Sequence, residues 1–421
     1  MDKTLTAKHK IYLDPAFDPA KEVVRATKET YGRNGQALFG NIAYLGNGAK
    51  LYQGFIEAHG NGDELSDSAK LMAKHGSTVA GDIADISRLI VIGGGSYNSI
   101  KNQELALVRE AIKQSPNEFR LNEFVLIDVS TDFLFEQQVA IDEFAREHGI
   151  EANIISIRSD FEQVSGARLD RILAKEFNGA KPRDAVKAAV ISTGATFGNL
   201  TNPVITGALP THDIDVRMAR QGDLVGVGSI SIFDYFTKME AAESYYNQKE
   251  LAEFFENIPN IILEYAGAAL ENFHANEYGK EDGAYFRYHA KSFYDSRLIG
   301  HQLVAQRPQE STIKNGTGAR VLTIGLNEKY TMMYSARPRS DDIQSRPVRN
   351  TGLHADYYVS NGDLVMHVAT KVSEAEVLKV DEDDVQEVHM MTEVPKQSSL
   401  FDKALTSLGL TPRRVGIRHG F

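Results

Sequence analysis

Short apolar segments alternate with longer amphipathic ones over residues 88–232 of the chain. Helical periodicity follows the first two apolar segments, at 102–113 and 133–148. Strands that are apolar throughout and alternate with helices are typical of parallel strands buried on both faces, so the pattern predicts a doubly wound α/β sheet. The strands are expected at residues 88–92, 123–128, 153–157, 185–192 and 222–230.

The segments on either side of this region have a different character. Glycine is dense from Gly32 to Gly62, with aromatic residues between, which indicates short helices and turns. A helix is expected over 234–255, and polar and apolar residues then alternate as in a half-exposed antiparallel sheet. The strand-like segments there are 284–294, 298–306, 319–334 and 356–368. We therefore predict a Rossmann-like domain at 76–232 and 394–421, with a second, α+β substrate-binding domain at 1–75 and 233–393.

The composition excludes several kinds of site. The chain has 421 residues, of which 42% are hydrophobic, and its net charge of −11 argues against nucleic-acid binding through a basic surface. It contains no cysteine, so disulfides, cysteine–zinc sites and a thiol nucleophile are ruled out. Its histidines lack metal-ligand spacing, the acidic run 381–384 lacks the pattern of a calcium loop, and no GxSxG elbow suggests a hydrolase. No metal is expected.

The chain also lacks the hydrophobic segments that membranes require. No stretch approaches about 18 apolar residues, and the first twenty residues contain no apolar core of a signal peptide. We therefore expect a cytoplasmic protein that acts on a small molecule without nucleic-acid or membrane partners. The sequence leaves the oligomeric state open, a homodimer included.

Two candidate ligand-binding features follow the first two predicted strands. Gly93, Gly94 and Gly95 end the first strand, where glycine lets the backbone approach a ligand closely, although a tight turn would use the same residues. Asp128 ends the second strand, where an acid can accept hydrogen bonds from ribose hydroxyls. The alternative for Asp128 is a helix cap, which Ser130 could equally supply. The glycine loop lacks the GxxxxGK[ST] phosphate cradle, which disfavours ATP hydrolysis, whereas a nucleoside without phosphates needs no such cradle.

The next two strands also end in residues that could contact a ligand. Asp160 and Phe161 follow the third strand and could bind and stack adenine, or could simply begin a helix. Thr193, Gly194 and Asn199 belong to a small polar segment after the fourth strand. In a doubly wound sheet the active site lies at these carboxyl ends. A loop with an asparagine helix cap is the alternative reading of that segment.

Four segments of the chain form an ordered set of motifs. They are IDVS at residues 127–130, SDFEQ at 159–163, TGATFGNLTN at 193–202 and MTEVPKQS at 391–398. Together they resemble the histidine-specific S-adenosylmethionine-dependent methyltransferase family, whose best-known member makes trimethylhistidine in ergothioneine biosynthesis. The last three segments are similar to the family's GDFEE, LGSTIGNLTP and LTEVSCKF, and the first contains the family's acid after the second strand.

The resemblance implies S-adenosylmethionine as the cofactor, with S-adenosylhomocysteine as the product. The glycine loop, with Thr193 and Gly194, would face its methionine part. Asp128 would bind the ribose, and Asp160 with Phe161 the adenine.

The resemblance also implies how a substrate is held. Asn199 and a tyrosine, either Tyr245 or Tyr246, would hold the amino and carboxylate groups of an amino acid. A second tyrosine precedes the cofactor domain, with Tyr44 and Tyr52 as candidates. The family's imidazole-binding glutamate matches Glu393.

We therefore predict an N-methyltransferase that acts on the amine of a small amino acid or amino-acid-like metabolite. Pro395 stands where the family has a serine that contacts imidazole, which argues against histidine itself. One alternative is the same fold methylating a larger natural-product amine or a hydroxyl. The other is a non-catalytic or nicotinamide-binding Rossmann-like protein.

Overall fold

The computed structural model of the chain describes residues 10–32, 40–59, 64–177, 179–194, 196–200, 211–240, 242, 246–276, 284–315, 318–346, 348–373 and 375–376. All of them belong to one compact unit, Met1–Val377. The predicted return of 394–421 to the Rossmann-like domain lies outside the described residues.

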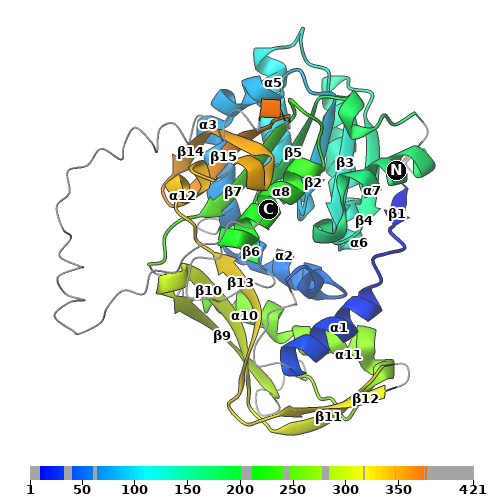
Figure 1. The fold of residues 1–421 in the computed structure, drawn as a ribbon, viewed down its shortest axis with the longest axis vertical. Helices are drawn as coiled ribbons and strands as arrows, with labels where there is room; N and C mark the ends of the chain where they lie inside the picture. The colour runs from blue at the N-terminus through cyan, green and yellow to red at the C-terminus, as the bar shows by residue number, and fades with distance from the viewer. Residues whose placement is uncertain are drawn as a thin grey trace, which may run out of the picture. The chain divides into compact units, whose positions relative to one another are not determined.

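An eight-stranded sheet in the order β1-β4-β3-β2-β5-β7-β15-β14 forms the centre of this unit (Figure 1). The first six strands of that order are parallel, and β15 and then β14 are antiparallel to their neighbours. The strands are β1 (Ile11–Leu13), β2 (Arg88–Ile92), β3 (Glu123–Asp128), β4 (Asn153–Arg158), β5 (Ala188–Ser192), β7 (Ile230–Phe236), β14 (Leu353–Asn361) and β15 (Leu364–Lys371). The predicted parallel α/β sheet is confirmed.

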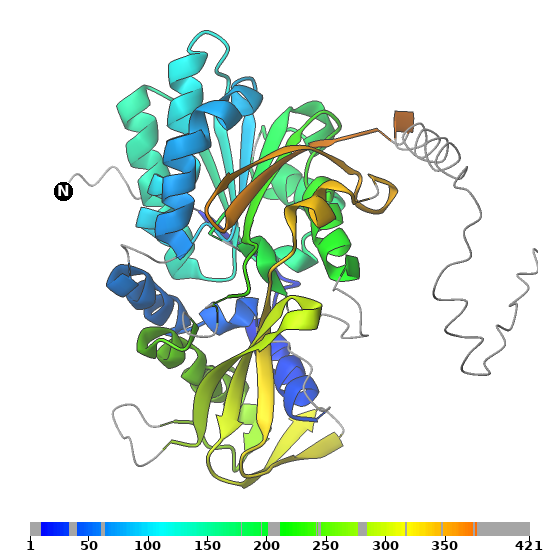
Figure 2. The ribbon, with the colours of Figure 1, turned by 90° about the vertical axis from the view of Figure 1, so that its left-hand side faces the viewer.

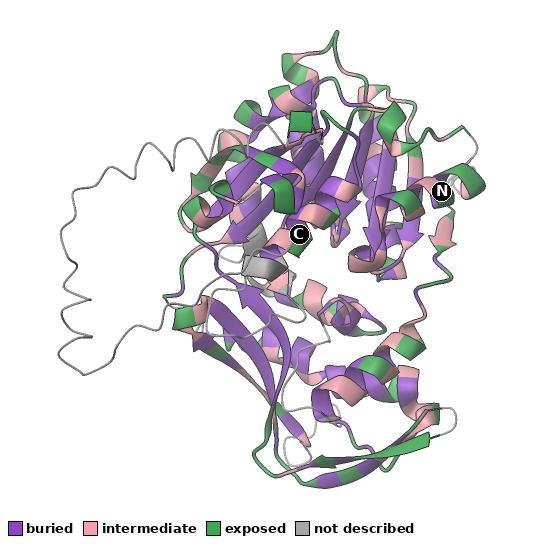
Figure 3. Ribbon diagram, in the orientation of Figure 1, coloured by how far each residue is buried: buried purple, intermediate pink, exposed green. Residues whose placement is uncertain are grey.

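Helices cover both faces of the sheet, as the apolar strands require. Leu89 and Val91 of β2 pack on one face against α3, α4, α5 and α6, while Ile90 and Ile92 pack on the other face with α7. The central strands are buried along their length (Figure 3). The helices of these two layers are α3 (Glu64–Ala80), α4 (Tyr97–Asn102), α5 (Glu104–Gln114), α6 (Thr131–His148), α7 (Gly166–Glu176) and α8 (Thr211–Asp223).

The fifth strand lies later in the chain than predicted. Residues 222–230 comprise the end of α8, a loop and only the first residue of β7. Gly228 has a φ of +78°, a turn conformation that glycine adopts without strain, and the strand begins two residues later. The helix predicted over 234–255 is also wrong, because its first residues belong to β7 and α10 covers only Lys249–Glu256. Asp234 is fully buried in β7, so the apolar pattern of the strand is interrupted.

Several segments expected in the substrate-binding region extend the central sheet instead. The predicted strand 356–368 is the hairpin β14–β15, which turns at Gly362 and pairs with β7. Near the N-terminus, β1 pairs with β4, and α3 packs on the sheet. The Rossmann-like layers therefore include residues from the predicted ranges 1–75 and 233–393.

The remaining elements form the predicted α+β region, which shares one hydrophobic core (Figure 2). Its larger antiparallel sheet has the order β6-β13-β10-β9, and its smaller one the order β12-β11-β8. These strands are β6 (Asn199–Leu200), β8 (Leu270–Glu271), β9 (Phe286–Phe293), β10 (Leu298–Ala305), β11 (Gln309–Asn315), β12 (Gly318–Ile324) and β13 (Lys329–Ala336). The helices of this region are α1 (Pro19–Gly32), α2 (Gly48–His59), α10 and α11 (Ile258–Ala266). Two further short helices, α12 (Ser340–Gln344) and α13 (Val348–Thr351), lie between β13 and β14 in the chain.

The strand β6 connects the two regions. It follows β5 of the central sheet, and its Asn199 pairs with Ser335 of β13 in the α+β region. Within the ranges described, no helix is long and apolar enough to cross a membrane, and no cluster of three acidic or histidine side chains could hold a metal ion.

Candidate active site

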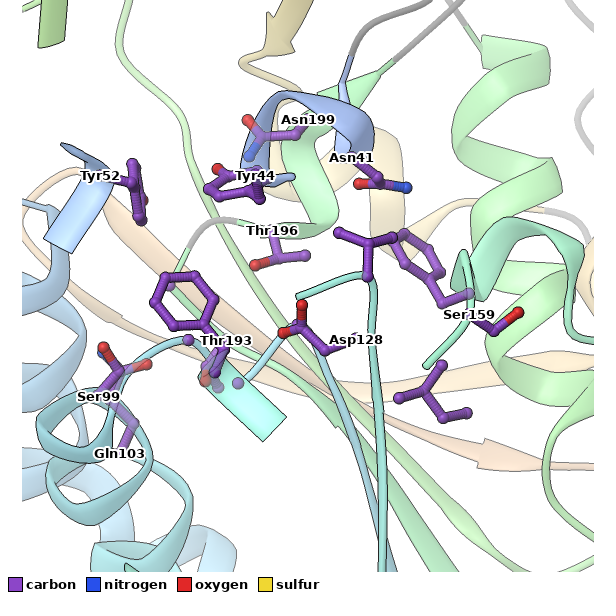
Figure 4. Close-up of a pocket in the computed structure, with 18 of the residues that line it drawn as sticks. Asn41, Tyr44, Tyr52, Ser99, Gln103, Asp128, Ser159, Thr193, Thr196 and Asn199 are labelled. Atoms are coloured by element: carbon purple, nitrogen blue, oxygen red, sulfur yellow. The ribbon is translucent and has the colours of Figure 1, made fainter. Parts of the chain in front are cut away.

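A pocket opens at the carboxyl ends of β2, β3 and β5 and holds about 710 Å³ of empty space, part of it continuous with solvent. At this point the strand order reverses, since β3 lies on one side of β2 and β5 on the other. Ligands of open α/β sheets bind at such switch points. In Figure 4, Asp128, Thr193, Ser99 and Gln103 line one side, and Asn41, Tyr44, Tyr52 and Asn199 the other.

The glycine loop after β2 forms one wall of the pocket with its backbone. Gly93 and Gly95 have φ values of +60° and +67°. A Cβ on Gly94 would lie 2.7 Å from Val91 Cγ1, and one on Gly93 would lie 3.1 Å from the Thr196 methyl group. All three glycines line the pocket, and side chains there would be strained or would clash.

Asp128 faces the pocket from the end of β3 with little accessible surface, 7%. Its carboxylate accepts hydrogen bonds from the Ser130 amide at 2.9 Å and Gln137 Nε2 at 3.4 Å. The cap of α6 is Ser130, whose Oγ accepts from the Phe133 amide at 3.3 Å, so the helix-cap alternative for Asp128 is wrong. Burial raises the pKa of Asp128 to about 6. The carboxylate retains lone pairs for hydroxyl donors in the pocket.

The loop after β4 contributes Phe161 but not the side chain of Asp160. Phe161 begins the 3-10 helix η4 (Phe161–Gln163) and lines the pocket. Asp160 caps that helix and accepts hydrogen bonds from the Glu162 amide at 3.0 Å and from Asn41 Nδ2 at 2.8 Å. Burial raises the pKa of Asp160 above its usual value. Asp160 therefore positions Asn41, which does line the pocket.

The segment after β5 supplies Thr193, Gly194, Thr196 and Asn199 to the pocket. The Thr193 hydroxyl donates to the carboxyl group of Glu104, whose pKa burial raises to about 8. Asn199 follows the 3-10 helix η6 (Thr196–Gly198), and its Oδ1 accepts from Ser335 Oγ at 3.1 Å. The small polar segment after the fourth predicted strand therefore lines the pocket.

Two predicted tyrosines form an aromatic wall opposite the sheet. Tyr44 belongs to the 3-10 helix η2 (Asn41–Tyr44) and Tyr52 to α2, and their ring centroids lie 5.0 Å apart. Phe133 of α6 lies 6.4 Å from the Tyr44 ring and also lines the pocket. Both predicted candidates therefore share one site.

The other predicted substrate residues have different positions. Tyr246 is buried outside the pocket lining, where its ring packs edge-on against His301 at 4.8 Å and its hydroxyl accepts from Arg337. Tyr246 supports the α+β core rather than facing the pocket. Tyr245 and Glu393 lie outside the described residues.

Sequence reasoning missed about half of the lining residues. Ser159 and Thr196 adjoin predicted residues and could have been included with them. Asn41 and Met333 carry no local signal, because only the tertiary fold brings their segments to the sheet. The lining residues missed are Asn41, Ser99, Gln103, Ile127, Val129, Phe133, Ser159, Thr196 and Met333.

The helix that follows the glycine loop is not arranged for a pyrophosphate. The Tyr97 amide of α4 donates to Glu136 Oε2 at 2.9 Å, and Ser96 Oγ caps the helix by accepting from the Ser99 amide. In dinucleotide-binding sheets this helix N-terminus receives the phosphates, but an acid takes that position here. The described residues that line the pocket include no lysine, arginine or histidine. The site is therefore suited to an uncharged or cationic nucleoside.

No protein-family model matches the chain, and no curated protein matches its sequence. Solved structures similar to it include an S-adenosylmethionine-dependent methyltransferase from Clostridium acetobutylicum, with 9% identity over 76% of this chain and 99% of that one, at a TM-score of 0.35. A sugar N-methyltransferase from a Streptoalloteichus species has 9% identity over 76% and 93%, with a TM-score of 0.35. An amino pentose methyltransferase from Micromonospora echinaspora has 10% identity over 76% and 97%, with a TM-score of 0.33. Likeness at this level does not assign an activity to the chain.

Proposed function

We propose that the chain is an S-adenosylmethionine-dependent methyltransferase that acts on the amine of a small amino acid or amino-acid-like metabolite. The observation that carries the proposal is the turn between β2 and α4. Its glycine loop and the neighbouring Asp128 suit a nucleoside, while Glu136 at the following helix N-terminus disfavours phosphates. S-adenosylmethionine combines an adenosine with a positive charge and contains no phosphate.

The sheet topology argues against a dinucleotide. Without the edge strand β1, the parallel strands follow the order that dinucleotide-binding sheets share, but the antiparallel hairpin β14–β15 stands where those sheets continue with a parallel strand. The edge of this sheet therefore differs from that of a dinucleotide-binding sheet.

The residues of the pocket suit the separate parts of this cofactor. Asp128 would accept hydrogen bonds from the ribose hydroxyls, Phe161 would stack on the adenine, and the glycine loop would lie along the methionine part. The fit is favourable because the loop leaves no Cβ in the way and Asp128 has acceptor capacity to spare. When bound, the cofactor would supply an electrophilic methyl group.

The chain's own contribution is to bind and orient the acceptor. Asn199 would help to fix the acceptor next to the cofactor site, and good alignment of two reactants as a whole can lower the barrier by roughly 7–11 kcal/mol. Tyr44, Tyr52 and Phe133 exclude water, and burial against these rings lowers the pKa of an entering amine, so that it is neutral when it reacts. We propose more specifically that the acceptor is related to histidine. The resemblance of the sequence to the histidine-specific family supports this choice.

Calorimetric titration of the full chain tests the proposal directly. S-adenosylhomocysteine should bind, whereas NADH should not. If NADH binds and S-adenosylhomocysteine does not, the chain is a dinucleotide binder and the proposal is wrong. If histidine tightens the binding of S-adenosylhomocysteine, the family's own substrate is supported. If histidine has no effect, other small amines are the candidates.

Replacement of Asn199 by Ala separates catalysis from cofactor binding. We expect turnover with a competent amine to fall about tenfold, since the loss of roughly 1.4 kcal/mol of orienting interaction has that effect. Affinity for S-adenosylhomocysteine should stay within about twofold of the wild type. If turnover and affinity for S-adenosylhomocysteine fall together, Asn199 contacts the cofactor or supports the loop after β5. That result would argue against a role of Asn199 toward the acceptor.

A further inference from the structure

A buried chain of hydrogen bonds runs from the pocket into the α+β region. Ser335 Oγ of β13 lies 3.1 Å from Asn199 Oδ1, and His301 Nε2 of β10 lies 2.9 Å from the same Oγ. Beyond it, the Tyr288 hydroxyl of β9 lies 2.7 Å from His301 Nδ1. Three neighbouring strands of one sheet therefore support a single side chain at the pocket wall.

The imidazole at the centre of this chain is neutral. His301 is 1% exposed and is stacked on the Phe255 ring at 4.5 Å. Burial and the nearby positive charge of Arg337 lower the pKa of His301 to about 3. A neutral imidazole has one N–H and one bare nitrogen, so the chain of hydrogen bonds has a direction.

Only one of the two directions gives every hydroxyl and N–H hydrogen of the chain an acceptor. If Tyr288 donates to Nδ1, His301 donates from Nε2 to Ser335, and Ser335 donates to Asn199 Oδ1, each hydroxyl and N–H has an acceptor. In the reverse direction the hydrogen of the partly buried Tyr288 hydroxyl has no acceptor among the described residues. Donors shielded from water without a partner are disfavoured. The first direction therefore prevails.

We propose that Tyr288, His301 and Ser335 are positioning residues that hold the Asn199 carbonyl away from the pocket and its amide N–H groups toward it. This inference rests on the proposed function, and it defines the acceptor further. Because Asn199 donates, the substrate is expected to present a hydrogen-bond acceptor to it, and a carboxylate is the strongest such group in a small amino acid. In Figure 4 the amide nitrogen of Asn199 lies on the side of Tyr44 and the oxygen on the opposite side.

The described lining contains no lysine or arginine that could pair with a carboxylate. A carboxylate bound there would therefore depend on amide and hydroxyl hydrogens, those of Asn199 among them. An amine with no oxygen beside it would leave the Asn199 N–H groups desolvated and unpaired. Simple amines are therefore expected to bind more weakly than the corresponding amino acids.

Long-range proton–nitrogen NMR of the ¹⁵N-histidine-labelled chain tests the direction without any ligand. The signal of His301 is identified by its loss in His301→Gln. We expect the Nε2–H tautomer in the wild type. The Nδ1–H tautomer would mean that the chain runs in reverse and Asn199 presents its carbonyl, which overturns the inference whether or not the methyltransferase proposal holds.

Calorimetry with matched probes tests the acceptor class on the chain saturated with S-adenosylhomocysteine. The probes are amino acids and their decarboxylated amines, such as histidine with histamine and tyrosine with tyramine. An amino acid should bind at least tenfold more tightly than its amine, and Ser335→Ala should reduce that ratio to about twofold. An amine that binds as tightly as its amino acid overturns the inference, whereas failure of S-adenosylhomocysteine to bind overturns the proposed function itself.

Two variants control for a merely structural effect of Ser335→Ala. Ser335→Thr keeps the hydroxyl and should restore the preference for the amino acid. Thr331→Val removes a different buried hydrogen bond between the same strands, from Gln302 at 3.2 Å, and does not touch Asn199. If Thr331→Val reduces the preference as much as Ser335→Ala does, the three residues act only through stability and the inference is wrong.

Discussion

Replacement of Asp128 by Asn is expected to weaken the binding of S-adenosylhomocysteine by about 100-fold or more while raising the stability of the free protein. The affinity falls because the variant loses a charged acceptor for two hydroxyl donors, each worth roughly 1.5–3 kcal/mol. The stability rises because a buried carboxylate is removed. Its pKa of about 6, against 3.8 for an ordinary Asp, corresponds to a penalty of up to about 3 kcal/mol at neutral pH.

The pH dependence of both effects follows from the same raised pKa. At a pH below the pKa of 3.8 that Asp128 has in the unfolded chain, its carboxyl group is protonated in both the folded and the unfolded state. As the pH rises from there to about 6, the folded wild type loses stability, because its buried carboxyl group resists ionisation. The stability gain of Asp128→Asn should therefore be full above pH 6 and absent near pH 3. Wild-type affinity for S-adenosylhomocysteine should fall below pH 6, since a protonated Asp128 is a weaker acceptor.

Thermal unfolding and calorimetry at several pH values check this prediction. Asp132→Asn is the matched control, because Asp132 is an exposed acid in the first turn of α6, close to Asp128 in sequence. It should leave the affinity unchanged. An Asp128→Asn variant that binds S-adenosylhomocysteine as the wild type does would rule out Asp128 as a cofactor contact.

Replacement of Arg217 by Gln should destabilise the fold by roughly 1–3 kcal/mol and also weaken cofactor binding. Arg217 of α8 is almost fully buried and connects two pocket loops. It donates to the backbone oxygens of Thr196, at 2.9 Å, and Asn199, and its guanidinium lies 2.5 Å from Glu162 Oε1. It also packs over the Phe161 ring at 5.1 Å. Its loss removes the guanidinium hydrogens that these three oxygens share.

Denaturant unfolding and titration with S-adenosylhomocysteine measure both consequences. Arg220→Gln, an exposed position on the same helix, is the control and should change neither quantity. If Arg217→Gln unfolds like the wild type, the ion pair between Arg217 and Glu162 is not the connection between the loops. If the variant is destabilised but binds S-adenosylhomocysteine normally, the loops keep their positions without the arginine.

The sequence alone determined the Rossmann-like part of the fold because strand and helix periodicity is local. The strands β2, β3 and β4 have the boundaries predicted for them to within one residue. It failed at β7, where the buried Asp234 hydrogen-bonds to Ser68 of α3 and to the Gly194 amide. A polar residue in a strand is stable only with such partners, and the partners come from distant segments.

The sequence also identified the pocket residues that lie in loops directly after strands. The glycine loop, Asp128, Phe161, Thr193, Gly194 and Asn199 all lie there, because parallel strands bring their carboxyl ends to one edge. Tyr44 and Tyr52 came only from the family resemblance, since nothing in their own segment connects them with the sheet.

Only the tertiary structure decided how the far wall of the pocket is built and which way Asn199 faces. Asn199 and Ser335 are 136 positions apart, and the two-residue strand β6 has no local pattern that would reveal its pairing with β13. The direction of the Tyr288–His301–Ser335 chain depends on which hydrogens find acceptors after all three strands have paired. Hydrophobic periodicity carries no information about such buried polar contacts, because they are set by proximity in space and not by spacing along the chain.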